Sequence, residues 1–291
     1  MVSGGLAINK SEGVTSTQVG NIAKAMFGCP KVGHIGTLDP NATGVLILML
    51  GNATKVIPYV QELPKTYIAG FKLGSTSNTY DIWGEVAEHG YGGDIPETHI
   101  RSVMEEFTGK IDQIPPMFCA KQIDGVRLYN LAYKGIELPR KPNPVEIYRL
   151  ELLSYDQSIG EGQFLLECSK GTYVRSLISD IGISCGCGAV MSALRRTVDM
   201  GYKVDECITL NDVHVSWDKE SLLIPMENFI DHIPRVDLTD AQARKIKFGN
   251  NASFQGFPAP AGVVRCFYQD TFLAMAKLVL STGEIIPERL I

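Results

Sequence analysis

The sequence predicts an α+β fold with a second, small β-rich unit at its C-terminal end. Strand-length apolar runs dominate the middle of the chain, and helical patterns lie among them without strict β-α alternation. The residues after about 234 consist of short apolar runs separated by turn residues. The 291 residues exceed one typical domain, and a composition of 45% hydrophobic and 20% charged residues is that of a globular protein.

The first predicted element is a helix over Ser16–Phe27, where apolar residues recur at helical spacing and Ser16 or Thr17 is suited to cap the start. A segment rich in turn-forming residues follows at 31–44. Three further elements are then predicted, strands over Val45–Leu50 and Tyr67–Leu73 and a helix over Ile100–Phe107.

The second half of the chain continues with a strand over Gln163–Cys168 and a helix that Thr172 caps and that runs to about Ile183. Beyond Pro234, three apolar runs predict strands of a small β-barrel or sandwich: Gly262–Phe267, Phe272–Leu280 and Ile285–Ile291. We therefore expect two domains, 1–233 and 234–291.

Residues 115–144 differ from the rest of the first domain. They hold five of the fifteen prolines and show little periodicity apart from a helical stretch near Leu128–Tyr133. Between Met117 and Arg149, six basic residues stand against three acidic ones. A long excursion of this kind is more often a lid or binding arm than a plain linker, although a solvated loop with a mild basic bias remains an alternative.

Several classes of function are disfavoured by the sequence. No apolar run approaches the roughly 20 residues that span a bilayer, and the N-terminus lacks the pattern of a secretory signal. Seven cysteines include one close pair, Cys185-Gly-Cys187, without a second pair or nearby histidine to complete a zinc set, so we expect no metal and a reduced, cytoplasmic protein. The phosphate-binding Gly-x₄-Gly-Lys-Ser/Thr pattern is absent, which argues against a nucleotide hydrolase.

The formal charge of −5 argues, as a bulk number, against a nucleic-acid partner. The acidic residues are concentrated, however. Residues 81–106 hold seven acids and one base, residues 199–231 hold eight acids and two bases, and the rest of the chain carries net +7. Because the Debye length is about 8 Å in physiological salt, distant acids are largely screened. The remaining surface is compatible with RNA.

The segment 31–44 combines chemical groups with glycines that permit close approach of a backbone or ligand. Its candidate residues are His34, Thr37, Asp39 and Thr43, with Gly33, Gly36 and Gly44. Because Asp-Pro commonly starts a turn, this segment alone favours a turn role for Asp39 over a catalytic one.

A second candidate segment runs from Ser169 to Ser176 across a strand-to-helix junction. Arg175 falls in the first turn of the predicted helix, where the helix dipole disfavours a cation. Either an anionic partner holds this arginine there, or it is a solvated surface residue.

These segments resemble the bacterial tRNA pseudouridine synthase B (TruB) family. The segment from Gly33 to Gly44 matches its G-H-x-G-x-L-D-P-x-A-T-G signature, and further motifs follow in family order along essentially the whole chain. They are Gly5–Lys10, Gly13–Ser16, Lys65–Tyr67, Asp81, Pro115–Met117 with Ala120 and Lys121, Cys168–Arg175 and Leu194–Arg196. Departures from the family pattern are Asn9, Ser11, Asn78 and Cys119.

The resemblance implies a mixed, largely antiparallel central sheet of the pseudouridine synthase type, with a PUA-like RNA-binding domain at the C-terminus. It implies isomerisation of uridine to pseudouridine at position 55 in the T-loop of tRNA, through base flipping and without cofactor or metal. The expected partner is the tRNA T-arm, with no membrane, no obligate protein partner and a monomeric enzyme. The excursion at 115–144 resembles the mobile thumb of the family.

The resemblance also assigns residues to roles. Asp39 is the expected nucleophile, Arg175 its ion-pair partner and Tyr67 the active-site tyrosine that packs on the base. Substrate contacts are expected from seven further residues: His34, which fills the space of the flipped nucleotide, Leu194 in the apolar wall, and Lys10, Lys65, Asp81, Lys121 and Tyr173.

Two other classes of function remain as alternatives. One is an RNA-binding or RNA-folding module of the same fold that does not depend on catalysis. The other is a sugar-processing hydrolase that uses Asp39 with a second carboxylate, for which Asp81 is the candidate. Formation of pseudouridine by the wild type and its loss in an Asp39 variant would separate the three.

Overall fold

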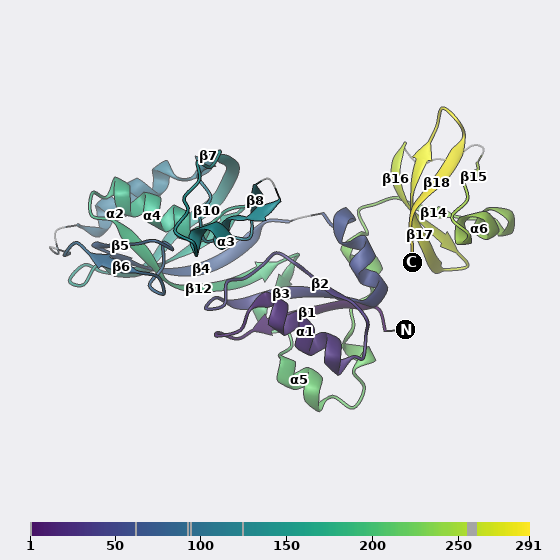
Figure 1. Ribbon diagram of the computed structural model, residues 1–291, viewed down its shortest axis with the longest axis horizontal. Coiled ribbons are helices and arrows are strands. Elements are labelled where there is room, and N and C mark those ends of the chain that lie inside the picture. Colours follow the sequence, from purple (N-terminus) through teal and green to yellow (C-terminus); the bar gives the residue numbers. More distant parts are fainter. Residues whose placement is uncertain (1, 62, 92, 94, 124, 255–260) are drawn as a thin grey trace.

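The computed structural model describes residues 2–61, 63–91, 93, 95–123, 125–254 and 261–291. The molecule is elongated, with one large sheet extending from one end to the middle and a smaller sheet at the other end (Figure 1). No helix within these residues is both long and apolar enough to cross a membrane.

The large sheet contains nine strands in the described chain, and its main path runs β1-β3-β12-β4-β11-β10-β7. All of its pairs are antiparallel except β12 with β3, so the sheet is mixed and largely antiparallel as predicted. The strands are β1 (Gly4–Lys10), β2 (Val32–Ile35), β3 (Thr43–Leu50), β4 (Lys65–Leu73), β7 (Gly109–Gln113), β10 (Asn143–Asp156), β11 (Glu161–Cys168), β12 (Ala189–Asp199) and β13 (Tyr202–Lys203).

Strand β3 is apolar from Val45 to Leu50 because both of its faces are buried. Leu46 and Leu48 belong to the main core, together with side chains of the helices α1 (Ser16–Met26), α2 (Glu97–Glu106) and α4 (Val174–Ser184). Ile47 and Met49 belong to a second core, which includes Phe267 and Met275 of the C-terminal sheet. The two ends of the molecule are therefore joined through β3.

The C-terminal sheet has the order β14-β16-β17-β18-β15 and its own core. Its strands are β14 (Arg235–Asp237), β15 (Ala252–Ser253), β16 (Gly262–Tyr268), β17 (Thr271–Val279) and β18 (Glu284–Leu290). The three apolar runs are strands as predicted, but the region also contains a helix, α6 (Asp240–Lys247), that the β-barrel or sandwich prediction did not include. Its polar sequence gave little apolar periodicity to recognise.

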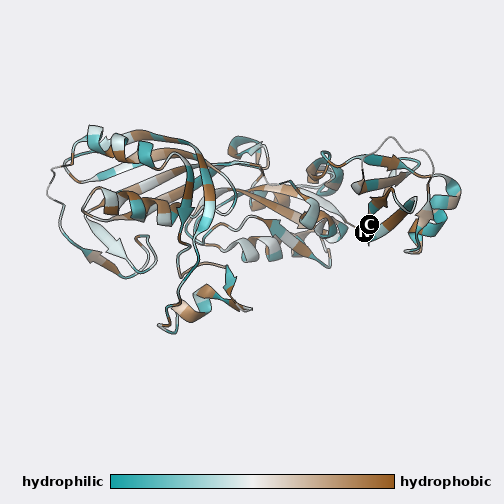
Figure 2. Cartoon of the chain, turned by 90° about the horizontal axis from the view of Figure 1, so that it is seen from above, coloured by the Kyte–Doolittle hydropathy of each residue, from teal (hydrophilic) through white to brown (hydrophobic). Residues whose placement is uncertain are grey.

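Residues 115–123 and 125–142 form an arm that stands out from the large sheet, visible below it in the view from above (Figure 2). The arm contains a short hairpin of β8 (Gln122–Ile123) and β9 (Val126–Arg127), followed by helix α3 (Leu128–Ala132). A small apolar cluster of its own, Met117, Cys119 and Leu128, holds it together. The helix predicted near 128–133 is confirmed.

The remaining elements are short. They are a hairpin of β5 (Ser75–Ser77) and β6 (Val86–Glu88), helix α5 (Leu210–Val215), and the 3₁₀ helices η1 (Gly51–Tyr59), η2 (Val204–Glu206), η3 (Glu220–Leu222) and η4 (Met226–Phe229).

Both helix-cap predictions are wrong. Thr15, not Ser16 or Thr17, caps α1, because its side chain accepts from the Gln18 amide while Gln18 bonds back in a capping box. Helix α4 begins after Tyr173 without a side-chain cap, and the Thr172 hydroxyl instead donates to the carbonyl of Ser169. The prediction also missed strand β2, because the turn-forming residues around it masked a strand of only four residues.

Candidate active site

The segment that follows β2 carries Asp39 between two paired strands. The Ser16 hydroxyl donates to the Leu38 carbonyl at 2.8 Å and accepts from the Leu38 amide at 2.9 Å. The Asp39 carbonyl accepts from the Ala42 amide at 3.1 Å, so the turn role expected for Asp39 is present in its backbone. Its side chain is not used by that turn and stays 42% exposed.

Arg175 lies in the first turn of α4, as predicted, and its anionic partner is Asp39. Its Nε lies 3.0 Å from Asp39 Oδ2, and the Arg175 side chain is only 8% exposed. The other guanidinium nitrogens donate to the carbonyls of Thr79 and Phe118, each at 2.9 Å. One buried arginine therefore links the Asp39 loop (residues 36–42, between β2 and β3), the turn before Asp81 and the base of the arm.

Asp81 lies on the far side of the same arginine. Its Oδ2 is 3.7 Å from Nη1 of Arg175, and its Oδ1 accepts from the Thr79 hydroxyl at 2.6 Å and from the Trp83 amide at 3.1 Å. The carboxyl is nearly buried. Two carboxylates thus share one guanidinium, and only that of Asp39 is substantially open to solvent.

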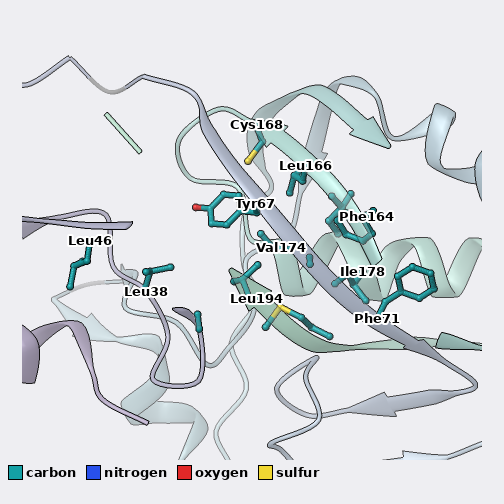
Figure 3. Close-up of a cluster of buried hydrophobic side chains, with 14 of the residues drawn as sticks. Leu38, Leu46, Tyr67, Phe71, Phe164, Leu166, Cys168, Val174, Ile178 and Leu194 are labelled. Carbon is teal, nitrogen blue, oxygen red and sulfur yellow. The ribbon is translucent and has the colours of Figure 1, made fainter. Parts of the chain in front are cut away.

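Tyr67 and Leu194 lie on the adjacent strands β4 and β12 and belong to the main core together with Leu38. Figure 3 shows the Tyr67 hydroxyl directed toward the side where Leu38 and Leu46 lie. Burial raises the pKa of Tyr67 to about 12, and the nearby Arg196 opposes this rise. The phenol is therefore a neutral hydrogen-bonding group in an apolar wall at ordinary pH.

Lys10 supports the loop from behind. It is 1% exposed, and its ammonium donates to the carbonyls of Ser11, Val14 and Pro40 at 2.7 to 2.9 Å. Burial lowers its pKa to about 8, against the opposing attraction of Asp39. All three donors are thus directed at protein carbonyls, so the structure places Lys10 under the loop.

His34 lies on β2, not in a turn, and its Nε2 is 3.1 Å from the Thr37 hydroxyl. Burial lowers the pKa of His34, and the charge of Arg196 lowers it further. Tyr173 immediately precedes α4 and packs against the apolar cluster of the arm. Burial raises the pKa of the Tyr173 phenol, with Cys119 contributing.

Lys65 and Lys121, the remaining two predicted substrate contacts, lie in different parts of the molecule. Lys65 is nearly buried, and its Nζ lies 3.9 Å from Oδ1 of Asp199, beneath the loop. Lys121 is exposed on the arm, where its carbonyl accepts from the Leu128 amide at 2.9 Å. The structure therefore brings Asp39, Arg175 and Asp81 together by direct contact, but not these two lysines.

Two further residues build the site and were not among the predicted ones. Arg196 is 1% exposed and donates to the carbonyls of Gly36 and Val45 at either end of the Asp39 loop. Gln113 accepts from the Tyr173 amide at 2.7 Å and donates to its carbonyl at 3.0 Å, which fixes the start of α4. Arg196 stood in a motif that carried the family resemblance, whereas nothing in the sequence marked Gln113.

Among the residues with described positions, no group of three or more histidine, cysteine, aspartate or glutamate side chains could hold a metal ion. The chemistry of the site is that of a carboxylate beside a buried guanidinium, with a phenol and an apolar wall. Such a carboxylate, oriented by a charge-assisted hydrogen bond from the guanidinium, is suited to nucleophilic attack.

Solved structures share this fold over nearly the whole chain. A Cbf5-Nop10-Gar1 complex matches with a TM-score of 0.70 and 27% identity, covering 99% of this chain and 84% of that chain. An H/ACA RNP bound to a substrate RNA containing 2'-deoxyuridine matches with a TM-score of 0.69 and 26% identity, with the same coverage.

The sequence comparisons define the class more closely, as that of the pseudouridylate synthases. Residues 24–174 match the TruB family pseudouridylate synthase N-terminal domain, and residues 175–231 match the tRNA pseudouridylate synthase B C-terminal domain. Curated relatives called tRNA pseudouridine synthase B are 37% identical in Aquifex aeolicus, over 100% of both chains, and 38% identical in Azoarcus sp., over 100% of this chain and 95% of that one. The chain belongs to the TruB family.

Proposed function

We propose that this TruB-family protein isomerises uridine to pseudouridine at position 55 in the T-loop of tRNA, with Asp39 as the nucleophile. The observation that carries the proposal is the ion pair between Asp39 and Arg175. It sets a half-exposed carboxylate 3.0 Å from a buried guanidinium, beside the apolar wall that holds Tyr67. The names of the curated relatives support tRNA as the substrate.

The reaction needs no oxidant and no group donor, because atoms are only rearranged. The bond between N1 of uracil and C1' of ribose breaks, the base turns, and a bond forms between C5 and C1'. The carboxylate of Asp39 adds to an electron-poor carbon of the nucleotide and later departs, while the C5 proton is lost and N1 gains one. Arg175 holds this carboxylate in one orientation through its Nε, 3.0 Å from Oδ2.

The target base must leave its stack to reach Asp39, and unstacking costs a few kcal/mol. We assign Tyr67 and Leu194 to the pocket that receives the base, since both lie in the apolar wall. His34 is the residue that would fill the vacated space in the RNA, and Lys121 on the arm would grip the backbone. Asp81 and Tyr173 complete the surroundings of the base, whereas Lys10 and Lys65 would act from below.

The two predicted domains have different proposed roles. Residues 1–233 would form the catalytic domain and residues 234–291 a PUA-like domain that contributes RNA binding. We propose that the enzyme acts in the cytoplasm as a monomer without a protein partner. Activity of the purified chain alone, measured together with its sedimentation at the assay concentration, tests the last point.

The decisive experiment compares wild type with Asp39→Asn on unmodified tRNA, with pseudouridine mapped by carbodiimide-blocked primer extension. We expect a stop at position 55 with wild type only, and a rate at least about 1,000-fold lower for the variant, with tRNA affinity within about threefold. Equal product from both proteins would refute the role of Asp39. Unmodified tRNA with wild type would favour the RNA-folding alternative, and release of free uracil would favour a hydrolase.

A further inference from the structure

Arg196 lies below the Asp39 loop and touches neither Asp39 nor Arg175 in any described contact. Its Nε donates to the Val45 carbonyl at 2.7 Å, and its Nη2 donates to the Gly36 carbonyl at 3.0 Å. Those two carbonyls flank the loop, Gly36 directly after β2 and Val45 at the start of β3. A single planar guanidinium thus ties the two ends of the loop together.

The charge of Arg196 is balanced within the core. Asp199, which is fully buried, places Oδ2 at 3.2 Å from Nε of Arg196, and Lys65 lies 3.9 Å from its other oxygen. A buried ion cluster of this kind contributes little net stability compared with apolar side chains of similar volume. A role in fixing geometry therefore explains its presence better than stabilisation does.

The glycines of the loop are matched to this arginine. Gly36 has φ +69°, and a Cβ there would lie 3.2 Å from Nη1 of Arg196 and from Cε of Lys65. Gly44 has φ +102°, and a Cβ there would lie 2.0 Å from the Arg196 carbonyl oxygen. The chain thus comes close to Arg196 at both ends of the loop, once at its side chain and once at its backbone.

We propose that Arg196 is a positioning residue, whose guanidinium clamps both ends of the Asp39 loop and sets the nucleophile against Arg175, with Asp199 as its buried counterion. The proposal rests on the function proposed above. Under this proposal, two arginines have different roles toward the Asp39 carboxylate. Arg175 contacts Asp39 directly, whereas Arg196 reaches Asp39 only through the loop backbone, although it also lies beside Tyr67.

The test uses Arg196→Lys, Arg196→Gln and the double variant Arg196→Gln/Asp199→Asn. The lysine keeps the charge but cannot span both carbonyls, and the double variant removes the uncompensated charge that would destabilise the single one. Arg101→Lys, which alters an exposed ion pair on α2, is the matched control. Each protein is assayed for single-turnover pseudouridine formation, tRNA dissociation constant and melting temperature.

We expect Arg196→Lys to lower the single-turnover rate by about 30-fold or more with tRNA affinity within about threefold, since only the reacting geometry is lost. The double variant should regain most of the melting temperature lost in Arg196→Gln but not the rate. A near-wild-type rate for Arg196→Lys, or recovery of rate together with melting temperature in the double variant, would overturn the proposal.

Amide hydrogen exchange measures how firmly Arg196 holds the loop without depending on catalytic activity. We expect the amides of residues 36–45 to exchange at least about tenfold faster in Arg196→Gln/Asp199→Asn, while those of β10 and β11 keep wild-type rates. Unchanged exchange across the loop would refute the clamp. Absence of product with wild-type protein would instead refute the proposed function and leave the exchange result to decide the clamp.

Discussion

At the scale of single residues, the site is defined by charges that the fold has removed from water. Arg175, Arg196 and Lys10 are all buried. Lys10 and Arg196 donate to backbone carbonyls in and beside the Asp39 loop, and Arg175 binds the Asp39 carboxylate and donates to the carbonyls of Thr79 and Phe118. A buried cation is costly unless such partners are in place. The loop is therefore held by side chains whose protonation and shape should be visible in its activity.

Lys10 predicts an alkaline limit to activity. Its pKa is about 8, so above that pH the ammonium becomes an amine with one donor fewer for three carbonyls. We expect the single-turnover rate to fall with an apparent pKa near 8. The variant Lys10→Arg should move this limb of the profile upward, because a guanidinium does not titrate in that range. A pH–rate profile of both proteins measures the difference.

The free energy of unfolding should change with pH in the direction opposite to the single-turnover rate. The pKa of Lys10 is lower in the folded protein than its ordinary value of 10.5, so between pH 8 and 10.5 the unfolded chain binds the additional proton. The contribution of this group to the free energy of unfolding therefore rises with pH across that window and is lost as pH falls through 8. Urea unfolding of wild type relative to Lys10→Arg should show it, and a declining difference would contradict the assignment.

At the scale of elements, the site depends on one parallel contact in an otherwise antiparallel sheet. Strand β12 pairs with β3 through Arg195 and Arg196, opposite Thr43 and Gly44, and with β4 through residues beside Tyr67. The Asp39 loop and the Tyr67 strand are thus set against each other by β12. Packing at this junction should be intolerant of added volume.

Gly44→Ala is expected to be strongly destabilising. Its φ of +102° is unfavourable for a residue with a Cβ, and that atom would lie 2.0 Å from the Arg196 carbonyl oxygen, a backbone atom that cannot turn aside. We expect a loss of at least about 3 kcal/mol in urea unfolding. Gly28→Ala is the control, because its φ is also positive, at +59°, but nothing lies within 4 Å, and about 1 kcal/mol is expected.

The arm should be sensitive to proteases when no RNA is bound. Its apolar cluster is small, and Tyr133 is 79% exposed on it, so local opening should be easy. We expect trypsin to cut the free protein first near Arg127 and Lys134, and tRNA to slow this cleavage at least about fivefold by ordering the arm. Sequencing of the early fragments gives the sites, and unchanged cleavage with tRNA would count against an RNA-binding arm.

At the scale of the whole molecule, the net charge of −5 conceals an uneven distribution. Two acidic stretches, 81–106 and 199–231, leave the rest of the chain with net +7. The Asp39 loop, the arm and helix α4 all belong to that remainder. The bulk charge then governs solubility, while local charge governs attraction to RNA.

Affinity for tRNA should therefore depend strongly on salt despite the acidic isoelectric point. We expect the association constant to fall more than about tenfold between 50 and 200 mM salt, and the slope of its logarithm to decrease by about one for each phosphate-contacting lysine removed. Lys134→Gln and Lys141→Gln test the arm, and Lys219→Gln in the acidic stretch 199–231 is the control. A slope unaffected by all three changes would place the RNA elsewhere.

The sequence by itself determined the family and located several main strands and helices, although it did not locate the long strands β10 and β12. A continuous apolar run located β3, and apolar patterning with turn and capping signals located β4, β11, α1 and α4, because burial leaves a local pattern in each. The position of Arg175 at the start of a helix, where a cation is disfavoured, indicated an anionic partner. The family signature indicated that this partner is Asp39. Residue types and their spacing suffice for such statements.

Only the tertiary structure decided which side chains support the loop and which stay open to solvent. Lys10 and Lys65 are buried beneath the loop, and Arg196 spans it, because strands from distant parts of the chain pack there. Burial and hydrogen-bond partners are properties of that long-range packing and leave no local pattern. The same packing turns an Asp-Pro turn into a carboxylate aimed at a buried arginine.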